Sequence, residues 1–446
     1  MSDAKKILAE KSLRYHQSPK PGKLEIIPSK PCTTQEDLSL AYTPGVAVPC
    51  MEIHNDKEKS FLYTNRSNCV CVVSDGTAVL GLGNIGPEAG LPVMEGKAVL
   101  FKRFADIDAV ALCLSHVHKE DGKTDPEKLI EAVKMLEPSF GGINLEDIGS
   151  PACFQVEPAL KAAMGIPVFH DDQHGTAIIS LAGILNALEL VGKKIEECKF
   201  VMNGAGAAGI ACAEYYISAG ARRENFILCD SKGVIRSSRT DLNKEKQRFA
   251  RDLDCATLAE AIKGADVFMG VSVAKSVTPE MVKSMAPGAV VFAMANPEPE
   301  IFPDEAIKAG AAVAGTGRSD FPNQVNNVLG FPGIFRGALD VRAKDINEEM
   351  KLAASRALAG IVREKMPEDI RKQLISAYPE DAAAGVFEGE IPLKSTFVIP
   401  KPFDPRVVPR VARFVAEAAM KTGVAQLPID DLDAYERSVA ERIGKK

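Results

Sequence analysis

The stretch KFVMNGAGAAGIACAEYYISAG, residues 199–220, decides the fold of the second half of the chain. An apolar run leads into the glycine pattern Gly204-Ala-Gly206-Ala-Ala-Gly209, and a helical pattern follows it. The first glycine permits a tight turn, the second lets a pyrophosphate approach the backbone, and the third allows the helix to pack closely on the strand. Asp230 ends the next apolar run, where a carboxylate that binds ribose is expected. The segment therefore predicts a Rossmann-type domain that binds a dinucleotide.

The residues expected to contact the dinucleotide lie in and just after this segment. They are Gly204, Gly206, Ala207, Ala208, Gly209, Asp230 and Lys232. Asp230 alone favours NAD, because it would bind the ribose 2′-hydroxyl and repel a 2′-phosphate. However, Ser231, Lys232, Arg236 and Arg239 follow it, and these side chains could neutralise a 2′-phosphate. A solvated basic loop would have the same sequence, so NADP and NAD both remain open as cofactors.

Short apolar runs alternate with amphipathic stretches on both sides of this segment. The predicted strands are NCVCVVS, DAVALCL, GGINLED and IPVFHDD before it, and NFILCD, DVFMGVS, AVVFAMAN and AAVAGTG after it. This alternation predicts an α/β fold, in which parallel or mixed sheets are covered by helices. Between NCVCVVS and TAVLGLG, the pair Asp75-Gly76 predicts a hairpin turn.

The chain is expected to form two domains and an arm. GTAIISLAGILNALELVG, residues 175–192, is apolar almost all round and predicts a helix buried between layers. We place the domain boundary there, with an N-terminal α/β catalytic and metal-binding domain over residues 1–175 and the Rossmann domain over residues 176–395. From Pro392 the sequence becomes Pro-rich and charged, and residues 396–446 are expected to form a C-terminal helical packing arm.

The composition excludes several classes of partner. A formal charge of −6 argues against nucleic acid, because binding to phosphates requires a basic surface. No uninterrupted apolar stretch has the length of a membrane span, and the charged N-terminus does not resemble a signal peptide, so a cytoplasmic protein without membrane contact is expected. The ten cysteines are expected to be reduced, structural core residues.

Two acidic pairs stand at the ends of predicted strands. Glu146-Asp147 ends GGINLED, and Asp171-Asp172 ends IPVFHDD. The carboxyl ends of strands face the ligand in such sheets, so the two pairs are expected to lie close together. Several carboxylates gathered at one place repel one another unless a cation binds them, and Mg²⁺ or Mn²⁺ is the cation that prefers oxygen ligands. Either pair alone could simply cap a helix or face water. His170 and His174, which flank the second pair, are expected to be structural, since a site rich in oxygen prefers carboxylates.

Several further segments occur in the same order in one known enzyme family. They are SLAYTPGVA (39–47), VVSDGTAVLGLGNIG (72–86), GLPVMEGKAVLFK (90–102), NLEDIGSP (144–151), FHDDQHGTA (169–177), NGAGAAGIA (203–211), DSKG (230–233), ANPEPE (295–300) and NNVLGFPGIFRGAL (326–339). Over nearly its whole length the chain resembles the malic enzymes, specifically the short bacterial type. The resemblance implies oxidative decarboxylation of L-malate to pyruvate and CO₂, with reduction of NAD or NADP, and decarboxylation of oxaloacetate. It also implies a homodimer or a higher homo-oligomer.

The resemblance also assigns roles to individual residues. It implies Tyr42 as general acid and Lys97 as general base, with Asp171 as support for that lysine. It implies Glu146, Asp147 and Asp172 as metal ligands. It implies Asn296 and Asn327 as contacts of malate or of the nicotinamide end of the cofactor. Lys97 could accept the hydroxyl proton of malate if its surroundings lower its pKa from about 10.4. The metal would draw electrons from the β-keto acid as it loses CO₂, and Tyr42 would protonate the resulting enolate.

One position departs from the larger, eukaryotic-type members of the family. Where these carry an arginine that binds a malate carboxylate, this chain has Ala78, as the short bacterial type commonly does. The distal carboxylate could therefore be held by backbone amides, Asn296, Asn327 or another basic residue. Some large bacterial relatives carry a C-terminal domain resembling phosphate acetyltransferase, which we do not expect within these 446 residues.

Two other functions are consistent with the same kind of scaffold. An amino-acid or hydroxy-acid dehydrogenase that does not decarboxylate would not require the metal-binding carboxylates. A catalytically inactive nucleotide-sensing protein would be indicated by the loss of Tyr42, Lys97 or Asp172, and all three are present.

Overall fold

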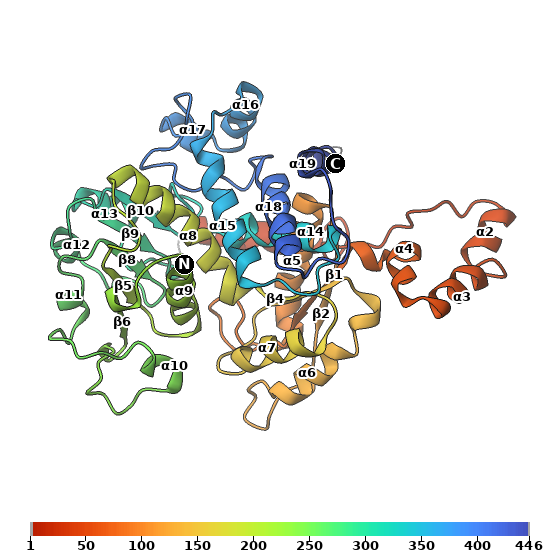
Figure 1. Cartoon of the computed structure of the whole chain (residues 1–446), viewed down its shortest axis with the longest axis horizontal. Helices are drawn as coiled ribbons and strands as arrows, with labels where there is room; N and C mark the ends of the chain where they lie inside the picture. The colour runs from red at the N-terminus through yellow and green to blue at the C-terminus, as the bar shows by residue number, and fades with distance from the viewer. Residues whose placement is uncertain (1–2, 445–446) are drawn as a thin grey trace. The chain divides into compact units, whose positions relative to one another are not determined.

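The computed structural model describes residues 3–444, and the chain divides into two compact units (Figure 1). Unit 1 comprises Met1–Val168 and Arg342–Asp345, and unit 2 comprises Phe169–Val341 and Ile346–Lys446. Each unit contains α/β structure of the predicted class. The division falls at residues 168 and 169, a few residues before the position proposed from the sequence.

A parallel sheet forms the core of unit 1. Its strands lie in the order β2-β1-β3-β4, where β1 is Cys69–Ser74, β2 is Asp108–Cys113, β3 is Gly142–Leu145 and β4 is Val168–His170. Three longer helices alternate with these strands: α5 (Pro87–Ala105), α6 (Pro126–Lys134) and α7 (Cys153–Ala163). Every residue of β1 is buried, as expected for a strand inside a parallel sheet.

The hairpin predicted after β1 is wrong. β1 pairs in parallel with β2 on one side and β3 on the other, so neither of its edges can accept an antiparallel partner. The following segment instead folds back as a loop, in which the amides of Ile85 and Gly86 both donate to the Gly76 carbonyl at 3.2 Å. Gly76 has φ 72° and lies so close to Gly86 that a Cβ would come within 2.3 Å of its backbone. Asp75-Gly76 does form a turn, but within this loop.

The segment before β1 forms an arm. It contains α1 (Asp3–Gln17), α2 (Gln35–Ala41), α3 (Ala47–Asn55) and α4 (Ser60–Tyr63). No described side chain from Lys6 to Asn68 is buried. Figure 1 shows α2, α3 and α4 projecting from the rest of unit 1. Cys32 and Cys50 lie exposed on this arm, so the prediction that all cysteines are core residues is wrong for these two.

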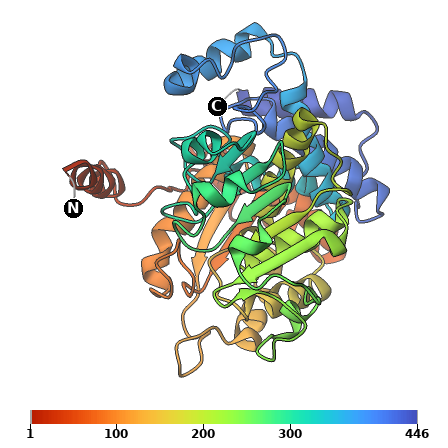
Figure 2. The same cartoon turned by 90° about the vertical axis from the view of Figure 1, so that its left-hand side faces the viewer.

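Unit 2 contains a six-stranded sheet in the order β10-β9-β8-β5-β6-β7 (Figure 2). Its strands are β5 (Phe200–Asn203), β6 (Phe226–Asp230), β7 (Gly233–Val234), β8 (Val267–Gly270), β9 (Val290–Ala293) and β10 (Val313–Thr316). β7, which the sequence did not predict, pairs antiparallel with β6, and the other pairings are parallel. Because β6 and β8 lie on opposite sides of β5, the connections between successive strands reverse direction at the carboxyl end of β5. Ligands bind at such reversal points, at the carboxyl ends of the strands.

Helix α8 (Asp171–Val191) is the buried helix predicted from the sequence. By length and composition alone it could cross a membrane, but 67% of its most apolar window is buried within the protein. This burial is typical of the core helix of a globular protein. Shorter helices connect the strands of the sheet: α9 (Ala207–Ser218), α10 (Lys244–Gln247), α11 (Leu258–Ala261), α12 (Pro279–Lys283) and α13 (Pro303–Lys308).

The C-terminal third of unit 2 is helical. It comprises α14 (Phe331–Asp340), α15 (Glu348–Arg363), α16 (Glu368–Ala377), α17 (Pro379–Ala383), α18 (Val407–Lys421) and α19 (Leu432–Gly444). Two glycines let α14 approach α18 closely. A Cβ on Gly333 would lie 2.7 Å from Val411 Cβ, and a Cβ on Gly337 would lie 2.5 Å from the Ala412 carbonyl oxygen. The C-terminal segment is therefore packed into unit 2.

The α14–α18 contact can be tested with one methyl group. Gly337→Ala should lower the free energy of unfolding by about 1–3 kcal/mol, because the helices would have to separate. Gly360→Ala in α15 is the matched control, since no described atom outside the helix lies within 4 Å of the added methyl. The control should be neutral, or stabilise the protein by up to about 1 kcal/mol. Urea unfolding measures both, and equal effects would contradict the proposed contact.

Candidate functional site

A buried ion pair lies at the carboxyl end of the unit 1 sheet. Lys97 lies on the buried face of α5, where Met94, Ala98 and Phe101 follow helical spacing, and the residue is 9% exposed. Its Nζ lies 2.8 Å from Oε1 of Glu146, which directly follows β3 and is 5% exposed. Asn144 Nδ2 donates to the other carboxylate oxygen of Glu146 at 2.9 Å. The pair and its hydrogen bonds hold the lysine ammonium at a defined position.

Asp147 lies beside this pair and joins it to the glycine-containing loop after β1. Its φ is 55°, which is uncommon for a residue other than glycine, and it is 5% exposed. The Asp147 carbonyl accepts a hydrogen bond of 2.9 Å from the Ala78 amide. Ala78 thus contributes its backbone next to the acidic pair, but no side chain that could bind a carboxylate.

The second acidic pair opens α8 in unit 2. Asp171 is fully buried, and Asp172 Oδ2 lies 3.9 Å from His170 Nδ1. A Cβ on Gly175 would lie 2.6 Å from Asp171 Oδ1 and 2.5 Å from Asn327 Cγ, so this glycine lets both side chains approach the helix. Thr176 Oγ1 donates to Asn327 Oδ1 at 3.5 Å. Two predicted site residues, Asp171 and Asn327, are therefore neighbours in unit 2.

The predicted metal ligands are divided between the two units. Glu146 and Asp147 belong to unit 1, and Asp172 belongs to unit 2. Across residues 3–444, no three His, Cys, Asp or Glu side chains are close enough to one another to hold a metal ion. The donors themselves suit a hard cation, because adjacent buried carboxylates supply the oxygen ligands that Mg²⁺ and Mn²⁺ prefer.

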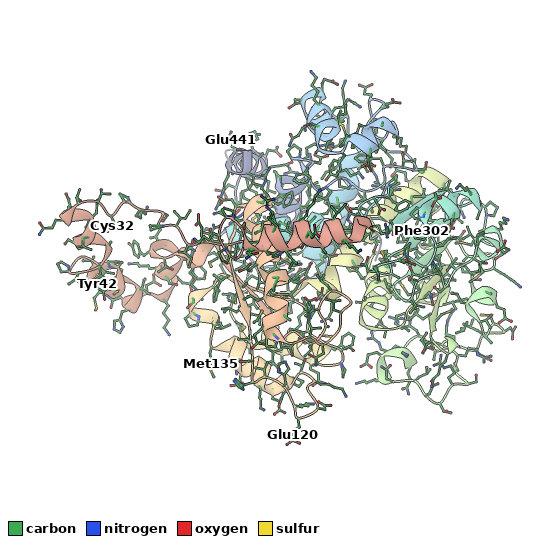
Figure 3. All side chains as sticks on the ribbon, turned by 180° about the vertical axis from the view of Figure 1, so that it is seen from behind. Cys32, Tyr42, Glu120, Met135, Phe302 and Glu441 are labelled. Carbon is green, nitrogen blue, oxygen red and sulfur yellow. The ribbon has the colours of Figure 1, made fainter. Side chains whose placement is uncertain are left out.

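Two other predicted residues are exposed. Tyr42 directly follows α2 on the arm and is 72% exposed (Figure 3). Asn296 is exposed in the loop after β9, where its side chain lies next to Gly317, at 3.5 Å from the position of a Cβ on that glycine. Unit 1 therefore brings Lys97, Glu146 and Asp147 together but leaves Tyr42 on the arm.

The glycine motif has the geometry that a dinucleotide requires. Gly204 has φ 115°, and a Cβ on it would lie 2.6 Å from the Val271 carbonyl oxygen. A Cβ on Gly209 would lie 1.8 Å from the Gly204 carbonyl oxygen, so only glycine permits this approach of α9 to the turn. At Gly206, by contrast, no described atom lies within 4 Å of the Cβ position. The backbone is thus open at Gly206, next to the N-terminus of α9, where a phosphate is favoured.

Asp230 is surrounded by positive charge at the end of β6. Arg239 binds it in a bidentate manner at 2.8 and 2.9 Å, and Lys246 Nζ lies 2.7 Å from Oδ2. Burial would raise the pKa of Asp230, but hydrogen bonds from Arg239, Lys246 and the Lys232 amide together lower it to about 2. Lys232 and Arg239 also bind Asp241.

Lys246 was missed from the sequence. It lies on the short helix α10, sixteen positions after Asp230, and no motif connects the two residues. The local signal in the sequence is Asn243, a residue type that commonly caps the N-terminus of a helix, and it does cap α10.

The chain matches two family models in succession. Residues 21–161 match "Malic enzyme, N-terminal domain", and residues 173–379 match "Malic enzyme, NAD binding domain". The chain is 52% identical to an NADP-dependent malic enzyme of Rhizobium meliloti over 98% of this chain and 55% of that protein. It is 51% identical to an NAD-dependent malic enzyme of the same organism over 96% of this chain and 53% of that protein. The chain thus spans about half the length of these curated relatives.

A solved structure matches the chain over nearly the whole of both molecules. The malic enzyme from Pyrococcus horikoshii superimposes with a TM-score of 0.86 at 43% identity, covering 98% of this chain and 96% of that one.

The charge cluster around Asp230 should contribute a measurable pH dependence. Its pKa in the folded chain lies below that of the unfolded chain, so its ionised form stabilises the fold above about pH 4, and this contribution disappears as the pH falls through about 2. Asp230→Asn should therefore lower the free energy of unfolding at pH 7 by up to about 2 kcal/mol, and by about half as much at pH 3. Urea unfolding between pH 7 and pH 3 measures this, with exposed Asp254→Asn as control. A deficit independent of pH would contradict the assignment.

Proposed function

The chain belongs to the malic enzyme family, and we propose that it oxidises and decarboxylates L-malate to pyruvate and CO₂ while reducing NADP. The observation that carries this proposal is the buried Lys97–Glu146 pair beside Asp147, at the carboxyl ends of the unit 1 strands. Simple hydroxy-acid dehydrogenases do not need this set of carboxylates. We assign unit 1 to catalysis and metal binding and unit 2 to the dinucleotide, in a cytoplasmic enzyme that also decarboxylates oxaloacetate.

Lys97 is the proposed base for oxidation. It accepts the proton of the malate hydroxyl while hydride leaves for the nicotinamide. Glu146 and Asn144 fix the position of Lys97 Nζ through a connected set of hydrogen bonds, and the amine form of this group is the one that accepts the proton. Glu146, Asp147 and Asp172 would hold a divalent cation, Mg²⁺ or Mn²⁺, which supplies Lewis-acid chemistry when bound. The assignment of Asp172, and of Asp171 as support for Lys97, rests on the sequence motifs.

Asn296 and Asn327 are the proposed amide contacts of malate or of the nicotinamide. Asn296 is exposed after β9, and Asn327 lies next to Asp171 in unit 2. Amide groups suit this role because they donate and accept hydrogen bonds without adding charge. The backbone amides of the loop that contains Ala78 are a further proposed contact for the distal carboxylate.

Tyr42 is the proposed acid that protonates the enolate carbon, and we infer that it acts in a homodimer. Its exposed position on the arm is unsuited to a reaction that excludes water. The arm also exposes large apolar side chains, namely Leu38, Leu40, Val48, Met51, Leu62 and Tyr63. An apolar surface of this kind is typical of an interface, and a second copy of the chain would cover it. In such a dimer Tyr42 would enter the active site of the partner.

The charges around Asp230 favour NADP over NAD. Three cations, Lys232, Arg239 and Lys246, face two carboxylates, Asp230 and Asp241, which leaves one net positive charge. Since Arg239 and Lys246 already occupy both oxygens of Asp230, this carboxylate is poorly placed to bind a ribose hydroxyl. The names of the relatives include both cofactors, so the preference proposed here rests on this cluster.

A steady-state assay tests the reaction and the cofactor together. Purified protein with malate and Mn²⁺ should form pyruvate and reduced nicotinamide in equal amounts. We expect kcat/KM to be at least about tenfold higher for NADP than for NAD. A single charge-assisted hydrogen bond to the 2′-phosphate would be enough to give a difference of this size. Chelator should abolish the activity, and added Mn²⁺ should restore it. Reduction of nicotinamide without pyruvate would indicate a simple dehydrogenase, and full activity in chelator would exclude the metal.

Complementation between two inactive variants tests the shared site. Tyr42→Phe and Lys97→Ala should each lower kcat by about 10²–10⁴-fold, because each removes a proton-transfer group. When the two are co-expressed with different tags, the heterodimer would contain one site with both groups intact and should recover up to about half of the wild-type activity. A purified heterodimer without activity would place Tyr42 in its own subunit. NADPH binding by each variant, measured by fluorescence, serves as the control for folding.

A further inference from the structure

Glu300 is a fully buried carboxylate in unit 2 to which the proposed reaction assigns no role. It ends the segment ANPEPE, which follows β9 and contains Asn296. Glu300 Oε1 accepts a hydrogen bond of 2.8 Å from the Ser272 amide, and Oε2 accepts one of 3.1 Å from the Ala295 amide. The two donors belong to different loops, one after β8 and one after β9. The carboxylate therefore joins these loops.

The surrounding backbone is built around this carboxylate. Gly270 is the last residue of β8, and a Cβ on it would lie 2.3 Å from Glu300 Cδ, so the absence of a side chain makes room for the carboxylate. Two backbone hydrogen bonds of 3.1 Å, from Lys275 to the Pro299 carbonyl and from Val277 to the Glu300 carbonyl, join the same loops further along. Both ends of the connection between the loops are thus fixed.

These loops lie where the dinucleotide is expected. β8 is adjacent to β5 at the point where the connections reverse, and the loop after β8 touches the glycine turn. The Val271 carbonyl oxygen lies 2.6 Å from the position of a Cβ on Gly204, and Asn203 Nδ2 donates to Ser276 Oγ at 3.0 Å. A shift of the loop after β8 would therefore change the surroundings of the glycine turn, and a shift of the loop after β9 would move Asn296.

A buried carboxylate is an unfavourable way to fill space. Burial raises the pKa of Glu300, while the backbone hydrogen bonds oppose this shift. An apolar side chain would avoid the desolvation, but it would leave the amides of Ser272 and Ala295 without this acceptor. The carboxylate is suited to the position because it has two oxygens, one for each loop.

We propose that Glu300 is a positioning residue for the dinucleotide, which sets the spacing between the loop after β8 and the loop that carries Asn296. The proposal rests on the proposed function, because it assumes that unit 2 binds NADP or NAD. In this role Glu300 does not touch the reacting atoms. It acts through the two amides that it binds, and its loss should weaken cofactor binding more than it slows the chemical step.

The test replaces one oxygen of the carboxylate. Glu300→Gln keeps the size of the side chain but turns an NH₂ group towards one of the two amides. The Kd for NADPH, measured by fluorescence, and the KM for NADP should each rise about tenfold, while kcat at saturating NADP changes much less. Asp266→Asn is the matched control, because Asp266 also accepts a backbone amide, from Lys199 at 2.8 Å, and binds Lys193 at 2.6 Å. Asp266 lies at the opposite end of β8, so this variant should lose stability and retain its Kd.

Gly270→Ala provides a second variant, since the added methyl would displace the Glu300 carboxylate without changing it. It should raise the Kd for NADPH in the same direction as Glu300→Gln. An unchanged Kd in either folded variant would overturn the proposal, as would an equal rise in Asp266→Asn. If wild-type protein binds neither NADPH nor NADH, the proposed function fails instead.

Hydrogen exchange supplies a measurement that needs no variant. Ser272 is exposed, yet its amide donates to a buried carboxylate, and the amides of Val271, Lys275 and Val277 donate to backbone carbonyls. These four amides within residues 271–277 should therefore exchange slowly in wild-type protein without dinucleotide. Exchange at the rate of an unprotected loop would overturn the proposal, whether or not the variants fold. Faster exchange of this segment in Glu300→Gln, with the rest of the sheet unchanged, would support it.

Discussion

The buried contact between Lys97 and Glu146 is the interaction on which the catalytic part of unit 1 depends. A lysine and a glutamate can be buried together only if each compensates the desolvation of the other and the remaining oxygen finds a donor. Here the donor is Asn144, which lies on β3 two residues before Glu146. The helical spacing of α5 and the end of β3 must therefore match, because a shift of one residue in either would separate the pair. Asp147, with its positive φ, then links this pair to the loop after β1.

In unit 2 the site depends instead on positions where a side chain is missing. Gly204 and Gly209 bring α9 against the turn that follows β5, and Gly175 admits Asp171 and Asn327 to the same face of α8. Gly270 leaves room for the Glu300 carboxylate. In each case a neighbouring polar group or backbone segment occupies the space that the Cβ of any other residue would need. The glycines thus define the shape of the site, and the polar residues supply its chemistry.

Much of this arrangement could be predicted from local sequence. The glycine motif, the buried helix α8 and the main strands each leave a periodic or spaced signal within a few residues. The hairpin after Asp75-Gly76 was wrong because local turn residues do not reveal that β1 is an inner strand with parallel partners on both sides. Lys246 and Glu300 were missed for a related reason. Their contacts join segments that the sequence separates, Lys246 to Asp230 and Glu300 to Ser272. The order of β8 and β9 in the sheet brings the second pair together, and the position of the short helix α10 brings the first.

The distribution of burial along unit 1 has a consequence for limited proteolysis. The first buried residue in the described part of the chain is Cys69, at the start of β1, and none occurs in the arm before it. A protease that cleaves an exposed arm need not disturb a core that begins further along. Cleavage near Lys57, which is exposed, would therefore leave both sheets intact and still remove Tyr42. A single cleavage in the arm would therefore separate the proposed acid, Tyr42, from the folded core of the chain.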